Sequence, residues 1–384
     1  MRVLMAGGGT GGHIMPALAV AEFLRESIPE AEVQFIGAAH GLESNVIPDE
    51  GFKLYTLPVR GLARTAGRAR WRALLGLGRG VTQAYQYLNR WRPDVVFATG
   101  GYVAPPVCLA AWLRRVPYVL FEPNTIPGRA NRWLCRFATE VHLGSAAARR
   151  RLPRRDRVRL TGVPIRPQIL FGNRTRATRM YRLEQDRFTV LVLGGSQGAH
   201  AINGLVVETL RELGPRDDVQ FILQSGPADY NWLLSRVRGL PVRTWVRPFI
   251  HQMGDALATA DLVIARAGAL TLAELCMTGR PSILIPYPFA ADDHQEANAR
   301  ALEEVGAARV LTADEASGLV VAQEILRLLK DQRALRSLGM MAQKLTRFDA
   351  AETIARRLAA LAAVEWPVRE KPRRRRRRGG RGRS

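Results

Sequence analysis

A glycine-rich segment that follows a short apolar run occurs twice in the chain. Residues 3–13 read VLMAGGGTGGH, and residues 190–200 read VLVLGGSQGAH. Beyond each loop the residues repeat at the same offset, with Leu18 matching Leu205. An apolar run, a glycine loop and a helical pattern in this order form a phosphate-binding unit, in which the loop leads from a strand into a helix. The repeat therefore predicts two similar halves, each built on such a unit.

Apolar runs of strand type alternate with helical patterns through both halves. This alternation predicts parallel sheets covered by helices, so we expect an α/β fold of two Rossmann-like parallel-sheet domains facing each other across a cleft. Ligands of such sheets lie at the carboxyl ends of the strands, which places the expected site in the cleft. Besides the repeated segments, the runs are 33–36, 52–57, 95–97 and 118–121, then 219–223, 242–245, 262–264 and 282–285.

The boundary between the halves is expected near the sequence GVPIR, which ends at Arg166. This gives a first domain at 1–165 and a second at 166–347. The helical pattern at 348–365 is expected to cross back onto the first domain. Residues 366–384 end on RRRRRRGGRGRS, which has no apolar side chain to bury, and are predicted to be a disordered, arginine-rich tail.

The composition fits a globular chain with anionic partners. The formal net charge is +23 at pH 7, which favours lipid head groups, nucleic acid or a diphosphate as partners. The three cysteines stand far apart without a C-x-x-C pair, so neither a zinc site nor a disulfide framework is expected, and a reducing cytoplasm fits. The apolar run after Arg2 ends at Gly7, so no secretory signal is expected.

The stretch 261–298 predicts a ligand pocket. A strand-like run begins at Asp261, Gly268 frees the backbone for a sharp turn, and a helical pattern follows from Leu270. The unpaired amides of a helix start attract a diphosphate without a metal. Glu274 would accept hydrogen bonds from a ribose diol, although the helix dipole alone also favours a glutamate in an early turn, and both interpretations stay open. A later loop offers partners for sugar hydroxyls in Asp292, Asp293, His294 and Gln295.

With these segments placed, the chain resembles the MurG family along nearly its whole length. These bacterial enzymes move N-acetylglucosamine from UDP-N-acetylglucosamine (UDP-GlcNAc) onto lipid I, the undecaprenyl-diphosphate-muramyl-pentapeptide lipid of peptidoglycan synthesis. One glycine loop would be a weak signal, but seven motifs follow each other in the family's order. They are GGTGGH at 8–13, TGGY at 99–102, EPN at 122–124 with NRWL at 131–134, GVPIR at 162–166, GGSQGA at 194–199, RAGALTLAE at 266–274 and HQEANA at 294–299.

The resemblance implies a B-type glycosyltransferase with the donor held mainly by the second domain and no cofactor. Glu274 would bind the ribose, Gln295 the sugar hydroxyls, and Ile250 the uracil through its backbone. Arg166 would approach the diphosphate from the boundary between the domains. The other implied contacts are Ser196 and Ala269, Leu270, Thr271, Leu272 and Ala273 on the donor side, and Thr10, Gly11, Gly12 and Asn124 on the sugar and acceptor side. Where this chain has Phe121, the family commonly has histidine, so a role for that ring nitrogen is in doubt.

Inverting transfer needs a base for the acceptor hydroxyl and charge stabilisation on the departing UDP. No D-x-D metal motif occurs in the chain, so a helix N-terminus and Arg166 are the expected counter-charges, with no metal. His13 is the predicted base because it follows the first glycine loop and titrates near neutral pH. Its alternative role is to cap or orient that loop. Glu122 is the alternative base, and its own alternative role is structural.

A lipid acceptor requires a docking surface. Residues 60–87 interleave arginines with apolar side chains, which suits the anionic lipids of the cytoplasmic face of the membrane. The same pattern is typical of an ordinary amphipathic helix with a buried face. We therefore expect a cytoplasmic protein that binds the inner face of the cell membrane peripherally.

Three other functions compete with lipid I glycosylation. The nearest are a diacylglycerol glycosyltransferase and a UDP-GlcNAc 2-epimerase, and the TGGY and EPN motifs favour lipid I over both. The third is nucleic-acid binding, which the arginine tail and the arginines of 149–155 suggest. No aromatic stacking platform accompanies these arginines, so no specific nucleic acid is expected.

Overall fold

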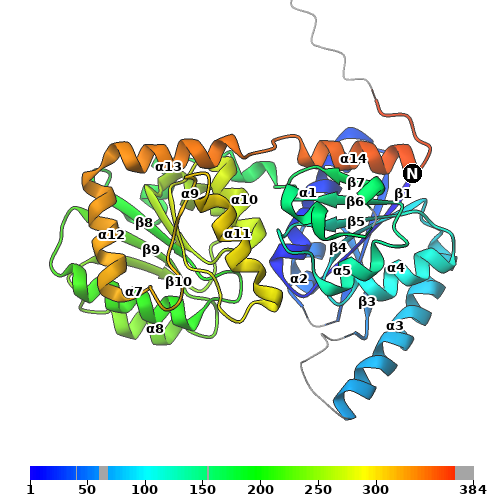
Figure 1. Cartoon of the computed structure of the whole chain (residues 1–384), viewed down its shortest axis with the longest axis horizontal. Helices are drawn as coiled ribbons and strands as arrows, with labels where there is room; N and C mark the ends of the chain where they lie inside the picture. Colours follow the sequence, from blue (N-terminus) through cyan, green and yellow to red (C-terminus); the bar gives the residue numbers. More distant parts are fainter. Residues whose placement is uncertain (40, 60–67, 154, 368–384) are drawn as a thin grey trace, which may run out of the picture.

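Two parallel sheets, one in each half of the chain, form the framework of the computed structural model, which describes residues 1–39, 41–59, 68–153 and 155–367. Figure 1 shows them in two bodies side by side. The first sheet holds β1 (Arg2–Gly7), β2 (Glu32–Ala38), β3 (Lys53–Leu57), β4 (Val95–Gly100), β5 (Tyr118–Glu122), β6 (Glu140–Leu143) and β7 (Val158–Leu160). The second holds β8 (Phe188–Leu193), β9 (Val219–Gln224), β10 (Arg243–Arg247), β11 (Leu262–Ala265), β12 (Ser282–Leu284) and β13 (Arg309–Val310).

Both sheets have the same strand order. The first runs β3-β2-β1-β4-β5-β6-β7 and the second β10-β9-β8-β11-β12-β13, with every pair parallel. In each sheet the strand of the repeated segment, β1 or β8, lies where the order reverses, which is where such folds bind ligands. The predicted α/β fold with two Rossmann-like sheets is therefore confirmed.

Helices cover both faces of each sheet. In the first half they are α1 (Gly11–Ser27), α2 (Glu43–Asp49), α3 (Arg68–Trp91), α4 (Ala104–Leu113) and α5 (Arg129–Leu134). In the second they are α6 (Arg174–Met180), α7 (His200–Leu213), α8 (Tyr230–Val237), α9 (Met253–Thr259), α10 (Ala269–Thr278), α11 (His294–Glu303), α12 (Gly318–Lys330) and α13 (Gln332–Lys344). Successive residues of β1, such as Val3 and Leu4, point into cores on opposite faces of the sheet and are fully buried. A strand buried on both faces explains the continuous apolar run.

The last helix, α14 (Ala350–Leu361), packs on α1 of the first half. Ile354 and Leu358 are fully buried in the core that lies between α1 and the sheet. Figure 1 shows α13 and α14 running in succession from the second body to the first. Trp366, which the sequence placed in the tail, stacks on Phe23 with ring centroids 6.1 Å apart. The rest of that tail, from residue 368, lies outside the described residues, and the domain limits stay a prediction.

Candidate functional site

The two glycine loops face each other across the gap between the halves. A Cβ atom built on Gly11 would lie 3.7 Å from the Oγ of Ser196, so the first loop lies directly opposite the second. Helix α10 also contacts α1. The amino ends of α1 and α10 therefore border one space, as a site at the carboxyl ends of both sheets requires.

The first loop turns sharply into α1. Gly9 has a φ of +91°, a left-handed conformation that favours glycine. Thr10 is the N-cap, and its carbonyl accepts hydrogen bonds from the amides of His13 at 3.1 Å and Ile14 at 3.3 Å. The amides of Gly11 and Gly12 stand in the first turn, where no intrahelical acceptor exists, so they are available to an anionic ligand.

His13 is held in one tautomer. Its Nδ1 lies 2.8 Å from the carbonyl oxygen of Thr99, and because a carbonyl only accepts, Nδ1 carries the proton and Nε2 keeps its lone pair. The Oγ1 of Thr99 donates in turn to the carbonyl of His13 at 2.6 Å. Burial lowers the pKa of His13, while the charges of Glu122 and Glu43 act against that shift. Burial therefore favours the neutral ring, the form that a base needs.

Glu122 organises the loop that follows β5. Its carboxylate accepts hydrogen bonds from the amide and the side-chain Nδ2 of Asn124 at 2.9 and 3.0 Å, from the amide of Gly128 at 2.9 Å, and from the Nδ2 of Asn131 at 2.8 Å. Its side chain is buried. Since these four donors already occupy the carboxylate, a proton could be accepted only by breaking a loop contact. The geometry favours the structural role of Glu122 over that of a base.

Asn298 of α11 joins the two halves beside this loop, a role that the sequence analysis did not assign. Its Oδ1 accepts from the amide of Thr125 at 2.8 Å, and its Nδ2 donates to Asn124 Oδ1 at 3.1 Å and to the Ala267 carbonyl at 3.2 Å. Asn298 thereby holds Asn124 next to the turn before α10. Only its place in the HQEANA motif marked it in the sequence.

Helix α10 begins at Ala269, with its first amides uncapped. Gly268 is the N-cap and makes no side-chain contact, and the first of its hydrogen bonds goes from the amide of Leu272 to the Gly268 carbonyl at 3.0 Å. The expectation that Gly268 frees the backbone is wrong, because its φ of −67° and ψ of 136° suit any residue. The space beside Gly268 is open, since an added Cβ would meet none of the described atoms within 4 Å. The amides of Ala269, Leu270 and Thr271 therefore border open space, while Leu272 is buried and Ala273 is half-buried.

Glu274 on α10 is an acid that no other described residue pairs with. Among the described residues its carboxyl oxygens take part in no hydrogen bond or ion pair, and burial raises the pKa of Glu274 to about 7. An acid whose charge is unsatisfied in the free protein gains most from a ligand that donates hydrogen bonds. Vicinal hydroxyls, such as those of a ribose, are donors of this kind.

Two glutamine side chains, Gln224 and Gln295, lie among the remaining residues predicted to hold the donor. Gln224 donates to the carbonyl of Gly195 at 3.0 Å and accepts from the amide of Ile250 at 3.0 Å, so it ties the second glycine loop to residue 250. The Oε1 of Gln295 accepts from the amide of Tyr287 at 3.0 Å. This leaves the Nε2 group of Gln295 as its donor for a ligand.

Arg166 is engaged by carboxylates of the first half. Its guanidinium contacts Glu22 at 2.6 Å and Glu50 at 2.8 Å. Two carboxylates already neutralise it, so contact with a diphosphate requires the side chain to leave at least one of them.

Phe121 lies outside the site. It is fully buried on β5, and its ring centroid lies 6.2 Å from that of Phe97 in the core. The side chain at this position therefore points into the first half and away from the cleft. Replacing the family's histidine by phenylalanine here removes no polar atom from the cleft.

An ion-pair cluster joins the halves at the rim. Asp292 contacts Arg129 and Arg132 of α5, each at 3.0 Å. Asp292 and Asp293 both have a φ of 52°, the left-handed region that only a few non-glycine residues adopt readily. The loop that leads into Gln295 and Asn298 is thus held in an unusual conformation next to a contact with the other half.

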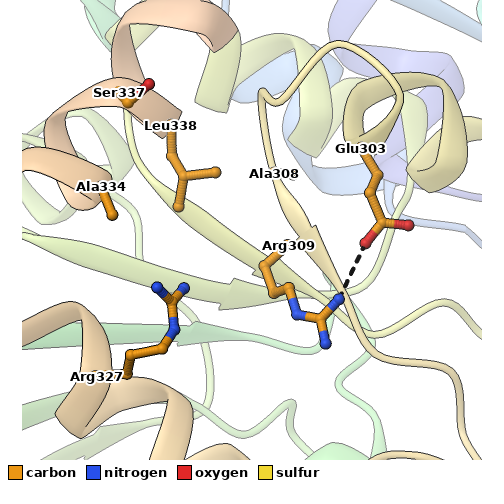
Figure 2. Close-up of a pocket in the computed structure, with 7 residues that line it drawn as sticks. All are labelled: Glu303, Ala308, Arg309, Arg327, Ala334, Ser337 and Leu338. Atoms are coloured by element: carbon orange, nitrogen blue, oxygen red, sulfur yellow. Dashed lines mark hydrogen bonds and ion pairs between the residues drawn. The ribbon is translucent and has the colours of Figure 1, made fainter. Parts of the chain in front are cut away.

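A cavity of about 370 Å³ lies elsewhere, in the second half (Figure 2). Its two arginines are both paired: Arg309 lies 3.5 Å from Glu303 in the lining, and Arg327 lies 2.7 Å from Glu324 outside it. It is lined by Glu303, Ala308, Arg309, Arg327, Ala334, Ser337 and Leu338, none of them a predicted site residue.

The part of the chain that the structure describes has neither a membrane-spanning helix nor a ready-made metal site. No helix there is both long and apolar enough to cross a membrane. No group of three or more His, Cys, Asp or Glu side chains there is arranged to hold a metal ion.

The fold and the facing loops suit a two-domain glycosyltransferase, and two family models identify that class. Residues 3–143 match the glycosyltransferase family 28 N-terminal domain, and residues 189–354 match the glycosyltransferase family 28 C-terminal domain. The chain belongs to the MurG family within this class, as its similarity to named members shows.

Two relatives carry the name UDP-N-acetylglucosamine–N-acetylmuramyl-(pentapeptide) pyrophosphoryl-undecaprenol N-acetylglucosamine transferase. The protein from Moorella thermoacetica is 43% identical over 92% of this chain and 97% of its own, and that from Thermodesulfovibrio yellowstonii is 42% identical over 88% and 93%. The crystal structure of Acinetobacter baumannii MurG has a TM-score of 0.71 at 27% identity, covering 94% of this chain and 99% of that one. A UDP-GlcNAc 2-epimerase from Neisseria meningitidis has a TM-score of 0.69 over 94% and 100%, but at 12% identity it shares the fold alone.

Proposed function

We propose that this protein transfers N-acetylglucosamine from UDP-GlcNAc to the 4-hydroxyl of the muramyl sugar of lipid I, with inversion, and so makes lipid II. The observation that carries the proposal is the close approach of the halves, at Gly11 and Ser196 and between α1 and α10, from which we infer that the Nε2 of His13 and the uncapped start of α10 meet one ligand. An acceptor hydroxyl and a sugar diphosphate need these two groups on opposite sides of the reacting carbon.

The donor is proposed to lie on the second half. The amides of Ala269, Leu270 and Thr271 would bind the diphosphate at the positive end of α10. Ser196, in the glycine loop of the same half, would bind it as well. Glu274 would accept from the ribose hydroxyls, and the backbone of Ile250 would meet uracil. The Nε2 of Gln295 would donate to the sugar hydroxyls.

The chemical step is a single displacement. The acceptor oxygen attacks the anomeric carbon while its proton passes to the Nε2 of His13, and the bond from that carbon to the diphosphate oxygen breaks. The electron pair leaves with UDP, and the amides at the start of α10 stabilise the developing charge. Arg166 is proposed to add a counter-charge after exchanging Glu22 or Glu50 for the diphosphate.

We also infer that the protein acts at the cytoplasmic face of the membrane, docked through the first half. Trp112 and Leu113 at the end of α4, and Trp133 of α5, are 49%, 55% and 45% exposed. Both tryptophans contact the ring of Phe137, so they form one surface. The arginines beside it are Arg114, Arg115 and Arg136. Exposed tryptophans among arginines suit the interface of an anionic bilayer.

The predicted docking segment 60–87 adjoins this surface. Residues 60–67 lie outside the described residues, and α3 carries the rest of the segment beside α4 (Figure 1). The guanidinium of Arg114 lies 5.5 Å from the ring centroid of Tyr85 on α3. The two segments would therefore meet a membrane together.

Parallel incubations with different acceptors test the proposed function. The protein is incubated with radiolabelled UDP-GlcNAc and a short-chain lipid I analogue, with diacylglycerol, or with no acceptor. Label should reach the lipid I analogue alone. Labelled diacylglycerol, or UDP-N-acetylmannosamine formed without acceptor, would instead indicate one of the two rival UDP-sugar activities.

A further inference from the structure

A buried carboxylate, Glu43, lies against the first glycine loop. Its side chain is 1% exposed. Its two oxygens accept from the amide of Gly9 at 3.2 and 3.1 Å, and one of them also accepts from the amide of Ala38 at 2.9 Å. Among the described residues no arginine or lysine forms an ion pair with it. A buried charge held by backbone amides alone is costly, so it indicates a function in the loop that it binds.

Three glycines make room for this carboxylate. A Cβ added to Gly8 would lie 2.3 Å from Oε1 of Glu43, one added to Gly37 would lie 2.7 Å from its Cγ, and one added to Gly41 would lie 2.2 Å from its Oε2. A side chain at any of these three positions would have to displace the side chain of Glu43. The loop and both flanks of Glu43 are therefore shaped around the carboxylate.

The contact is relayed from the loop to the ring of His13. A Cβ on Gly101 would lie 2.4 Å from the Gly8 carbonyl oxygen and 3.3 Å from Cδ2 of His13. Gly101 and its neighbour Gly100 thus form the wall between the loop and the imidazole. Displacing the loop from Glu43 would shift this wall, and with it the ring.

We propose that Glu43 is a positioning residue of the transfer reaction, which fixes Gly9 and, through the loop, the ring of His13 without touching either substrate. The proposal rests on the role of His13 as the base. A second effect follows from charge. The titratable groups that influence His13 are Glu122, Glu43 and His294, and the negative charge of Glu43 favours the protonated ring.

The test is Glu43→Gln, which keeps the size of the side chain but removes the charge and presents an NH₂ group to the amide of Gly9. We expect kcat to fall by roughly ten- to a hundredfold from misplacement of the base, with calorimetric affinity for UDP unchanged because the donor lies on the second half. The acidic limb of the pH profile of kcat should move to lower pH, because His13 loses a charge that raises its pKa. Glu26→Gln, at an exposed position of α1, is the matched control and should behave as wild type.

Two results would overturn the proposal: a wild-type kcat, or a lower kcat with the acidic limb unmoved. If Glu43→Gln does not fold, Glu43→Asp and Gly37→Ala replace it. Both keep the charge and disturb the contact, so kcat should fall while the limb stays in place, and full activity in both would contradict the positioning role. His13→Ala distinguishes a failure of the base assignment from a failure of the role of Glu43. If the acidic limb of the pH profile persists in His13→Ala, the base assignment is refuted. If the limb is lost in His13→Ala but unmoved in Glu43→Gln, only the role of Glu43 is refuted.

Discussion

The imidazole of His13 donates from Nδ1 to the carbonyl oxygen of Thr99 across 2.8 Å. In many catalytic histidines a carboxylate accepts this hydrogen bond. Here the carbonyl has the same effect, because it fixes the tautomer and the orientation of the opposite nitrogen. The partner lies on β4, far from His13 in sequence, and only the TGGY motif marked it there.

Replacing His13 should remove the base and leave the donor site intact. In His13→Ala we expect kcat to fall roughly 10²- to 10⁴-fold, the usual contribution of a positioned base. Steady-state kinetics and calorimetry with UDP measure the two effects. Added imidazole should restore part of the activity, because it can enter the space that the ring leaves. Unchanged turnover in this variant would exclude His13 as the base.

Glu274 should couple donor binding to a proton. Its pKa of about 7 lies above the ordinary 4.5 because of burial, and ribose hydroxyls bind the ionised form, so UDP binding should release protons near pH 7 and weaken as the pH falls below it. Calorimetry in two buffers of different ionisation enthalpy measures the release. Glu274→Gln should abolish it, whereas the exposed Glu304→Gln should not; equal proton release in all three would refute the assignment.

The same shift predicts a pH-dependent stability. The folded protein holds the Glu274 proton more tightly than the unfolded chain, so the unliganded protein should lose stability as the pH rises from 4.5 through 7. Glu274→Gln should therefore melt higher than wild type at alkaline pH, and the difference should disappear in acid. A thermal melt series across this range checks the sign, and a variant that melts lower at alkaline pH would contradict it.

The contact of Asp292 with Arg129 and Arg132 should favour the closed arrangement of the halves. Asp292→Asn tests the charge alone, because asparagine tolerates the left-handed backbone as aspartate does. Exposed ion pairs are weak, so we expect KM for UDP-GlcNAc to rise only about two- to fivefold, with kcat little changed. Asp314→Asn, at an exposed position of the same half, is the control. A variant whose KM equals that of wild type at low salt would show that the contact does not influence closure.

The exposed tryptophan surface should determine membrane binding. Trp112→Ala with Trp133→Ala, or charge reversal at Arg114 and Arg115, should weaken co-sedimentation with anionic vesicles by about tenfold or more. Transfer to a water-soluble acceptor should continue at the wild-type rate. Arg211→Glu, on an exposed part of α7, serves as control. Charge reversal at Arg68, Arg70 and Arg72 tests the segment predicted from sequence, and binding that survives every one of these changes would exclude docking through this face.

A strand could be predicted from the sequence only where its own residues carry the pattern. The centre of each sheet was predictable because β1 and β8 are buried on both faces and read as apolar runs beside glycine loops. Strand β6 was not predicted, since Glu140 and His142 interrupt its apolar pattern and are accommodated by a hydrogen bond between their side chains at 3.0 Å inside the fold. Strand β13 is two residues long and carries no pattern at all.

Within the site, residue types were easier to predict than their partners. The start of α10 and the Glu274 carboxyl were predicted to be ligand groups and stay a prediction, whereas the sharp turn expected of Gly268 is absent from its backbone angles. Asn298, Thr99 and Glu43 act through contacts with residues distant in the chain. Such contacts have no periodicity or spacing in the sequence, so only the fold reveals them.

The central claim is direct displacement by an acceptor hydroxyl on a donor held by backbone amides. The most direct measurement is the configuration of the new glycosidic bond, determined by NMR on product made from UDP-GlcNAc and a lipid I analogue in excess chelator. The account predicts a β linkage formed at an undiminished rate. An α linkage, or a reaction that stops when the chelator is added, would contradict it.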